Sequence, residues 1–372
     1  MAEAAKTTDR KHGALPYQAL REYMRDGHIK DADSKNVQPA SIDLSITDEV
    51  YRLPGVVQPL VREPVESLVE RFRGVLTDVG APLERNTVYI ARLRETLDLP
   101  YEVFGLVNPK STTGRLDVHV RVIADGTPRF DTVEQGFSGE LWIMIVPRSF
   151  PIILKAGTPF CQLRLFTGEP RLNESMLETV FDTEALLWRE TGDQILYEDV
   201  PVTDHDGSII LTLDTYSEPV GWVATNVNVP IDPTLVGGYK AQKFFQPMVL
   251  DSGYVYLRRD HFYILSTREF VRVPPTLACE MVPMDERSGE FRAHYAGFID
   301  PGWGWGKNGE EKGRPLTLEV RPHEDIIIGP RQPIGKIAFE HMIEKPEVVY
   351  DAGSSNYSAQ EGPKLAKQFK IL

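Results

Sequence analysis

The sequence predicts a mainly β fold made of two tandem copies of one module, with a few short helices. From residue 88 to residue 166, short segments rich in β-branched and aromatic residues follow one another, separated by Gly, Pro, Asn or Asp. The second half of the chain then repeats the first. Residues 262–274 (FYILSTREFVRVP) align without gaps on residues 88–100 (VYIARLRETLDLP), with Tyr, Ile, Arg, Glu and Pro coinciding. Many short strands with turn signals favour a barrel or a sandwich for each copy.

Two further matches occur in the same order in both halves. Residues 208–213 (SIILTL) match residues 41–46 (SIDLSI), and residues 326–339 (IIIGPRQPIGKIAF) resemble residues 152–166 (IILKAGTPFCQLRLF). A period of roughly 170 residues is too long for a solenoid and indicates two domains of one kind. The expected parts are module 1 at 14–170, a helical and acidic connector at 171–205, module 2 at 206–345, and a C-terminal closing segment at 346–372.

The individual elements follow from periodicity and from turn residues. Apolar residues at helical spacing predict a helix over residues 15–25, which ends at Gly27. A second helix is expected after Pro64, because proline suits the first helical position, and residues 174–190 (ESMLETVFDTEALLWRE) predict a third. The stretch at 192–207 is acidic and rich in turn residues. Strands are predicted at 41–46, 88–93, 101–107, 118–123, 140–146 and 162–166.

Composition narrows the class of function. The chain has 372 residues and a net charge of −13, and a field of that sign repels nucleic acid. It has no run of about eighteen apolar residues that could span a membrane, and the first residues (MAEAAKTTDRKHG) lack the apolar core of a secretory signal. These features predict a cytoplasmic protein with no membrane or nucleic-acid partner, and they leave small-molecule chemistry open.

The cysteine and histidine content predicts a protein without zinc. Cys161 and Cys279 are the only cysteines, which fits a reducing compartment and excludes a cysteine-rich metal site. The sequence also lacks the H-x-E and P-C-x-x-C pair of zinc deaminases. His119, His261 and His294 do not recur at metal-ligand spacing.

The stretch NPKSTTGR at 108–115 carries the densest set of polar groups suited to a ligand. Lys110 offers a point charge, Arg115 a planar fork of donors, and Ser111 and its neighbours three hydroxyls. Such groups suit a phosphorylated ligand. Its proline and glycine indicate a turn or the end of a strand. The alternative is a surface turn whose charges are solvated.

Three motifs in order resemble the dCTP deaminase family. They are QPASIDLSI at 38–46, PKSTTGR at 109–115 and IDPGW at 299–303. The match is to the long bacterial form of this hydrolase, which shares the β-clip superfamily with trimeric dUTPase. The resemblance implies two distorted β-barrel modules, hydrolytic deamination of dCTP to dUTP and ammonia, a homo-oligomer and regulation by dTTP. The alternatives are a dUTP diphosphatase, a bifunctional deaminase and diphosphatase, and a non-catalytic nucleotide sensor.

The resemblance also implies how the catalytic residues are divided. In the family, a serine and an arginine spaced as Ser111 and Arg115 lie in the active site, and a glutamate in a strand after the IDPGW turn is the general base. Module 1 has Met144 at that glutamate position, whereas module 2 has Glu319. We therefore expect one composite site that combines Ser111 and Arg115 with Glu319, within the chain or across an oligomer.

The corresponding loop of module 2, PMDERSG at 283–289, lacks the serine. Ungapped alignment from Pro274 puts Asp285 opposite Ser111, whereas counting back from Ile299 puts Arg287 opposite Arg115. A second site that pairs this loop with Met144 is expected to be inactive in deamination. A structural or a regulatory role for it stays open.

Deamination without zinc needs a protein group that takes a proton from water. Glu319 is expected to do so, with Ser111 orienting the water and Arg115 keeping the glutamate ionised. Alternation along the strand puts Glu319 on one face with Thr317, opposite the apolar side chains. By itself this pattern also fits a solvated strand carboxylate.

The remaining binding residues are likewise implied by the resemblance. The Asp300 carboxylate is expected to accept a hydrogen bond from the deoxyribose 3′-hydroxyl, and a plain turn aspartate is the alternative. Mg²⁺ is expected to arrive bound to the triphosphate oxygens. The tail 350–363 resembles the segment that closes over the nucleotide, except that Asn356 stands where the family has a lysine. A disordered tail is the alternative. The residues expected to contact phosphates are Lys110, Thr112 and Gln162, and those expected in the closing segment are Tyr350, Tyr357 and Gln360.

Overall fold

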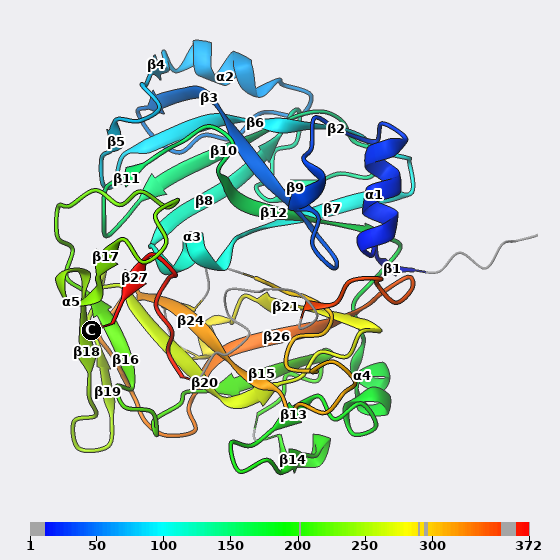
Figure 1. Ribbon diagram of the computed structural model, residues 1–372, viewed down its shortest axis with the longest axis vertical. Coiled ribbons are helices and arrows are strands. Elements are labelled where there is room, and N and C mark those ends of the chain that lie inside the picture. The colour runs from blue at the N-terminus through cyan, green and yellow to red at the C-terminus, as the bar shows by residue number, and fades with distance from the viewer. Residues whose placement is uncertain (1–11, 201, 289–290, 294–296, 351–361, 372) are drawn as a thin grey trace, which may run out of the picture.

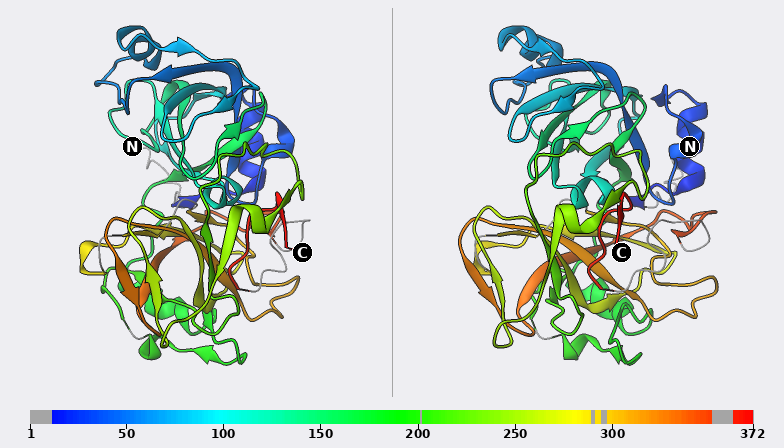
Figure 2. Two further views of the ribbon diagram at one scale, coloured as in Figure 1. Left: turned by 90° about the vertical axis from the view of Figure 1, so that its left-hand side faces the viewer. Right: turned by 60° about the vertical axis from the view of Figure 1, so that its left-hand side comes forward.

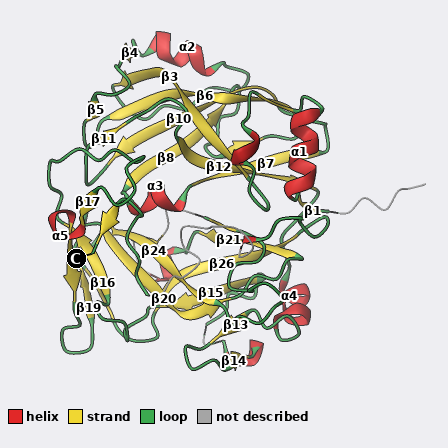
Figure 3. Ribbon diagram, in the orientation of Figure 1, coloured by secondary structure: helices red, strands yellow, loops and turns green. Residues whose placement is uncertain are grey.

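A computed structural model describes residues 12–200, 202–288, 291–293, 297–350 and 362–371. The chain forms two stacked β lobes, the first in blue to green and the second in green to orange (Figure 1). Strands make up most of both lobes, and the helices are short (Figure 3). The last described residues return to the boundary between the lobes, which other directions of view also show (Figure 2). The predicted mainly β, two-module fold is confirmed.

The first lobe contains three α-helices and one 3-10 helix: α1 (Tyr17–Arg25), η1 (Ser34–Asn36), α2 (Val65–Arg71) and α3 (Ser111–Arg115). Its strands are β1 (Gly13–Ala14), β2 (Ile29–Lys30), β3 (Ile42–Leu53), β4 (Val75–Leu76), β5 (Pro82–Leu83), β6 (Val88–Asp98), β7 (Val103–Pro109), β8 (Val118–Ala124), β9 (Thr132–Val133), β10 (Ser138–Pro147), β11 (Ile152–Ile153) and β12 (Pro159–Thr167). Most of them form one curled sheet in the order β8-β10-β6-β3-β12-β7-β9. The long strand β3 belongs to both halves of this sheet, because it pairs with β6 and with β12.

The second part of the chain contains α4 (Glu174–Phe181), η2 (Tyr197–Asp199), α5 (Ala241–Phe244) and η3 (Glu286–Ser288). Its strands are β13 (Leu187–Trp188), β14 (Gln194–Ile195), β15 (Ser208–Thr212), β16 (Gly221–Ala224), β17 (Tyr239–Lys240), β18 (Phe245–Met248), β19 (Val255–Leu257), β20 (Tyr263–Val271), β21 (Leu277–Val282), β22 (Phe291–Ala293), β23 (Phe298–Ile299), β24 (Arg314–Pro322), β25 (Ile326–Ile328), β26 (Pro333–His341) and β27 (Phe369–Lys370). Here the counterpart of β3 is interrupted between β15 and β16, which lie in two different sheets, of four and of seven strands. Pro219 lies in the interruption and has no backbone N–H for a sheet ladder.

Strand register confirms the alignment of the two halves. Ile90 on β6 pairs with Met144 on β10, and Ile264, its counterpart on β20, pairs with Glu319 on β24. Met144 and Glu319 therefore occupy the same position in the two modules.

The register also decides between the two alignments of the loop at 283–289. Asn108 pairs with Gln162 on β12, and Val282 pairs with Lys336 on β26, so residues 108 and 282 are equivalent. Counting forward from this pair places Asp285 opposite Ser111.

One local prediction was wrong. The helix predicted over 174–190 ends at Phe181, and Leu187–Trp188 is a strand. Leu187 pairs with Val271 on β20 and is buried in the second core, so tertiary pairing overrides the local helical pattern. The stretch 108–115 contains the end of a strand, as one of its two readings predicted, because β7 runs to Pro109; the helix α3 follows directly.

The face of the sheet around Met144 is closed within its own module. Met144 is buried in a cluster with Trp142 and with Val65, Leu68 and Val69 of α2. The segment of module 2 at the same place in the strand order instead crosses to the first lobe, where Phe244 and Phe245 of that segment pack on Phe150. Module 2 thus leaves the face around Glu319 without such a helix.

The C-terminal residues join the two lobes. Phe369 packs with Phe244 and Phe245, and β27 pairs in parallel with β17. The Trp222 indole Nε1 donates to the Pro363 carbonyl at 2.9 Å. Among the described residues, no helix is long and apolar enough to cross a membrane.

Candidate active site

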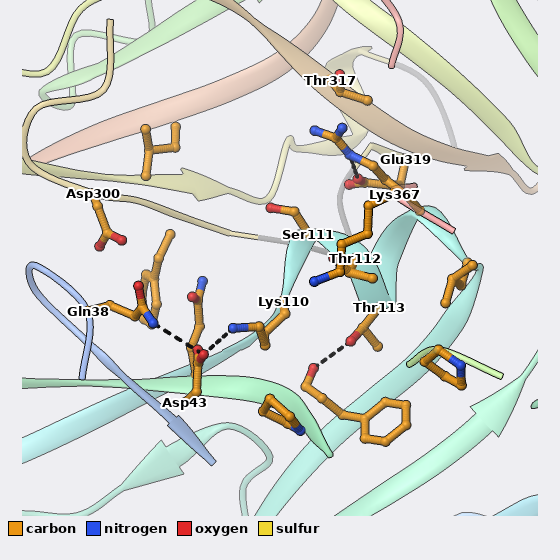
Figure 4. A pocket seen from close by; sticks show the side chains of 18 of the residues that line it. Gln38, Asp43, Lys110, Ser111, Thr112, Thr113, Asp300, Thr317, Glu319 and Lys367 are labelled. Atoms are coloured by element: carbon orange, nitrogen blue, oxygen red, sulfur yellow. Dashed lines mark hydrogen bonds and ion pairs between the residues drawn. The ribbon is translucent and has the colours of Figure 1, made fainter. Parts of the chain in front are cut away.

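A cavity of about 590 Å³ lies where the two modules meet. Its wall comes from β3, α3 and β12 of the first module, from β23 and β24 of the second, and from the C-terminal segment. Figure 4 shows the side chains from these elements pointing into it. Ser111, Arg115, Glu319, Lys110, Thr112, Asp300, Gln162 and Tyr350 all line it, so residues more than two hundred positions apart meet in one chain. Tyr357 and Gln360, with Asn356, lie outside the described residues.

The short helix α3 turns its polar residues into the cavity. The Thr113 hydroxyl donates to the Phe160 carbonyl at 2.8 Å, which fixes the helix on β12. Lys110, Ser111 and Thr112 precede this anchor and face the open volume. In the view of Figure 4, Ser111 lies between Asp300 and Glu319.

Arg115 and Glu319 form a buried ion pair between the modules. The Arg115 Nε lies 3.5 Å from the Glu319 Oε1, and the side chains are only 4% and 2% exposed. The Arg115 Nη1 also donates to the Lys364 carbonyl at 3.0 Å. The interpretation of Glu319 as a solvated strand carboxylate is therefore wrong. A carboxylate buried this deeply needs a cation close by to stay ionised.

The strand pattern around Glu319 agrees with the expected alternation. Thr317 and Glu319 line the cavity, whereas Leu318 and Val320 pack in the core of the second module. The sequence pattern thus identified the right face, but not that a second module would cover it.

Two charged residues in the cavity escaped the sequence analysis. The Asp43 carboxylate is buried, accepts a short hydrogen bond from the Lys110 ammonium and another from the Gln38 amide at 3.4 Å. Burial raises the pKa of Asp43, and the Lys110 charge opposes that rise. The signal for it was a lone charge inside the predicted strand SIDLSI.

Lys367 is the second of these residues and comes from the C-terminal segment. It lines the cavity close to Lys110 (Figure 4). Burial, and then the charge of Lys110, lower the pKa of Lys367, and Asp43 opposes this. Two ammonium groups thus share one carboxylate, which leaves an excess of positive charge. No sequence pattern marks Lys367, because only the packing of the last residues brings it there.

Asp300 also lines the cavity. Its carboxylate Oδ1 is 3.3 Å from the Nη2 of Arg164, and burial raises the pKa of Asp300 while Arg164 opposes the rise. Beside it, the rings of Trp303 and Tyr350 are in tilted contact, with 5.1 Å between their centroids. This wall therefore combines a hydrogen-bond acceptor with an aromatic surface.

The second expected pairing does not form within one chain. The loop of Asp285 and Arg287 lines a separate cavity of about 340 Å³. There Arg287 pairs with Asp285 and, at 2.8 Å, with Asp204 of the connector. Met144 is not among the residues around it, since α2 covers it elsewhere. Among the described residues, no three His, Cys, Asp or Glu side chains are grouped to hold a metal ion.

The architecture is that of a two-module β-clip protein whose modules share one polar cavity. Residues 11–169 match the family model of the 2'-deoxycytidine 5'-triphosphate deaminase N-terminal domain, and residues 181–369 match that of the C-terminal domain. The chain belongs to the dCTP deaminase family and is an enzyme of that family.

Individual relatives agree with this assignment. A crystal structure of 2'-deoxycytidine 5'-triphosphate deaminase from Agrobacterium tumefaciens is similar, with a TM-score of 0.80 and 35% identity, over 91% of this chain and all of that chain. A dCTP deaminase of Ignicoccus hospitalis is 28% identical over 159 residues, which are 42% of this chain and 84% of the relative. A probable deoxyuridine 5'-triphosphate nucleotidohydrolase of Methanopyrus kandleri is 33% identical over 128 residues, or 34% of this chain and 76% of the relative.

Proposed function

We propose that the chain hydrolyses dCTP to dUTP and ammonia at the cavity between its modules, and so supplies dUTP for the synthesis of pyrimidine deoxynucleotides. Membership in the dCTP deaminase family supports the reaction. The observation that carries the site is that Ser111 and Arg115 of one module line the same cavity as Glu319 of the other. The module that lacks the glutamate has the serine and arginine, and the reverse holds for its partner module.

Glu319 is the proposed general base. It takes a proton from a water molecule that attacks C4 of cytosine, a C–O bond forms, and Glu319 passes that proton on to N3. The carboxylate then takes the second proton from the C4 hydroxyl and delivers it to the amine, so that the C4=O bond forms, the C4–N bond breaks and ammonia leaves. Arg115, at 3.5 Å, keeps the glutamate ionised before it takes up a proton, and Ser111 orients the water by a hydrogen bond. Water activation by Glu319 makes zinc unnecessary in this scheme.

The nucleotide is proposed to lie across the cavity from one wall to the other. Asp300 accepts a hydrogen bond from the deoxyribose 3′-hydroxyl, and the rings of Trp303 and Tyr350, which are in contact, offer an apolar surface nearby. The triphosphate faces the opposite wall, with Mg²⁺ bound to its oxygens as part of the substrate. The phosphate contacts proposed there are Lys110, Thr112, Gln162 and Lys367. Tyr357 and Gln360 are proposed, from the family resemblance, to belong to a segment that closes over the nucleotide.

Lys367 supplies the charge that the tail lacks at Asn356. The amines of Lys110 and Lys367 repel each other on either side of the Asp43 carboxylate. A bound polyanion stabilises both amines, because it relieves this repulsion and replaces the hydration that they lose on burial. Action in the cytoplasm, which rests on composition and cysteine content, completes the proposal, together with homo-oligomerisation and feedback by dTTP, which rest on the family resemblance.

One relative favours a second candidate function. The similarity to a probable deoxyuridine 5'-triphosphate nucleotidohydrolase makes hydrolysis of dUTP to dUMP and pyrophosphate the alternative, alone or after deamination. The polar triphosphate wall would serve either reaction. A base such as Glu319, beside the nucleoside wall, favours deamination.

A product assay separates these functions. The protein is incubated with dCTP or dUTP and Mg²⁺, and ammonia and pyrophosphate are measured. Ammonia without pyrophosphate supports the deaminase, both products from dCTP support the bifunctional enzyme, and pyrophosphate from dUTP alone supports the diphosphatase. Binding without any product supports a nucleotide sensor.

Matched variants locate the reaction. Glu319→Gln is expected to lower ammonia release by about 10²–10⁴-fold, because the amide cannot take the proton from water. Glu140→Gln is the control, since Glu140 lies on β10, the equivalent strand of module 1, and does not line the cavity. Equal activity of both variants would contradict the proposed base.

A further inference from the structure

Arg164 is a fully buried arginine of β12 that the proposed chemistry leaves without a role. Toward its own module, the guanidinium Nε donates to the Ala40 carbonyl at 3.2 Å. Toward module 2, the Nη1 donates to the Cys279 carbonyl at 3.1 Å and to the Glu340 carboxylate at 2.8 Å. These contacts fix the plane of the guanidinium at the boundary between the modules.

The remaining nitrogen of Arg164 faces the nucleoside wall of the cavity. The Nη2 lies 3.5 Å from the Ile299 carbonyl and 3.3 Å from the Asp300 carboxylate. The guanidinium also lies over the ring of Phe298, at 4.2 Å from its centroid. Three consecutive residues of module 2 that line the cavity therefore contact one side chain of module 1.

The module fold by itself does not require an arginine at this place. Leu163 pairs with Val107 and Ile337 pairs with Met281, so the residue after each, Arg164 or Ala338, is equivalent. Module 2 places an alanine there and still forms the same strand pairing. Arg164 is therefore not needed for the barrel itself, and its role lies in the contact between the modules.

A rigid fork of donors has a defined effect on this wall. The fully buried Glu340 forms an ion pair with the Arg164 guanidinium, and Asp300 forms a second ion pair with the same guanidinium at the cavity. Burial raises the pKa of both carboxyls, to about 7 for Glu340, and the arginine opposes this in each case. Without it, Asp300 would be free to turn or to take up a proton, and it would no longer be a pure acceptor.

We propose that Arg164 is a positioning residue, which holds Asp300 and the backbone of β23 in the arrangement that recognises the nucleoside. Recognition of the sugar by module 2 then depends on a side chain of module 1. The inference rests on the proposed function, because it assigns the 3′-hydroxyl of a bound deoxynucleotide to Asp300.

The test compares two nucleotides that differ only at the 3′ position. Affinities for dCTP and for 2′,3′-dideoxycytidine triphosphate are measured by calorimetry in a Glu319→Gln background, which binds without turnover. With Arg164 present, dCTP is expected to bind about 10- to 100-fold more tightly, as for a hydrogen bond to a charged acceptor. With Arg164→Lys, which retains the charge but loses the fork, this preference is expected to fall below about threefold.

A merely structural role predicts a different result. If Arg164 only stabilises the contact between modules, Arg164→Lys weakens both nucleotides equally and their ratio is unchanged, which overturns the proposal. Equal binding of both nucleotides with Arg164 intact overturns it as well. Arg171→Lys is the matched control, because Arg171 pairs with Glu280 at the same boundary and does not line the cavity.

A second variant keeps the test decisive if Arg164→Lys does not fold. The pair Arg164→Met with Glu340→Met removes both buried charges together, and such replacements are often neutral for stability. This double variant is expected to show the cooperative thermal unfolding of a folded protein and to lose the preference for dCTP. A retained preference overturns the proposal. The proposed function fails separately, if the unaltered protein releases no ammonia from dCTP.

Discussion

Two inactive variants, combined in one assembly, test whether the site lies within a single chain. Ser111→Ala removes the hydroxyl from α3, and Glu319→Gln removes the base from β24. In the structure both residues line one cavity of one chain, and Arg115, on the same short helix as Ser111, is 3.5 Å from Glu319. Every site of a mixed assembly then carries one of the two lesions.

The two geometries predict activities that differ clearly. If the site lies within the chain, the mixture retains only the residual activity of the single variants, about 10²–10⁴-fold below the unaltered enzyme. If the site were shared between chains, random mixing would bring an intact serine and an intact glutamate together at roughly a quarter of the sites of a symmetric assembly. A quarter of full activity exceeds the residual level by at least about tenfold.

The assay needs assemblies that contain both variants. The two chains are co-expressed with different affinity tags and purified over both resins, and ammonia release from dCTP is then followed. A chain that carries both substitutions is the control for the lowest activity. If the two tags do not co-purify, the protein is a monomer, and the activity of the unaltered chain already places the site within it.

Recovery of a quarter or more of full activity in the doubly purified assembly would refute the reasoning, because selection for both tags removes the assemblies of one variant alone. It would mean that Glu319 of one chain serves Ser111 of another. The short distance between Arg115 and Glu319 would then be an ion pair with a structural role only.

Three further predictions concern the cavity and the core. Lys367→Gln should raise the KM for dCTP about 10- to 100-fold at neutral pH, whereas Lys370→Gln, at an exposed position of β27, should not. Because the pKa of Lys367 is lowered, the KM of the unaltered enzyme should begin to rise at a lower pH than the KM of Lys367→Arg. Parallel pH profiles of the two KM values would contradict this. Burial raises the pKa of Glu95 from 4.5 to about 7, so its contribution to the free energy of unfolding is present below pH 4.5 and is lost as the pH rises through 7. In urea unfolding, Glu95→Gln should therefore have a free energy of unfolding about 3 kcal/mol above that of the unaltered protein at pH 8.5, and nearly the same value at pH 4.5. A difference that does not depend on pH would be evidence against the shift. Met144→Glu should create no second deamination site and should destabilise the protein by about 3 kcal/mol or more in urea unfolding, because α2 buries the new carboxylate. An unchanged urea midpoint would show that α2 does not cover this face of the sheet.

Local regularities in the sequence predicted much of the fold. Strand patterning located the main strands of module 1, because alternation and β-branched residues act over a few positions, and the repeat located three of their counterparts in module 2. The helix predicted at 174–190 was too long, since pairing of Leu187 with Val271 cannot be inferred from neighbouring residues. The length of β3 was also underestimated, because its second half is defined by pairing with β6.

The candidate site was predictable only in part for the same reason. Ser111 and Arg115 were found through the resemblance to the dCTP deaminase family. Glu319 was found through the same resemblance, together with the repeat that sets it opposite Met144. Asp43, Lys367 and Arg164 were missed, because each acquires its role from a residue far away in the sequence. Lys367, for example, reaches the cavity only because Phe369 and its neighbours are packed in the first core.

The sequence by itself determined that the chain has two like modules and that each lacks what the other retains. Both features follow from which residues occur in the chain and in what order. Only the tertiary structure decided that the complementary halves meet within one chain. It did so because α2 covers Met144, whereas the corresponding segment of module 2 crosses to the first lobe and leaves Glu319 facing Arg115. Which face of a barrel is closed by its own helix depends on packing between distant segments, and no local pattern records it.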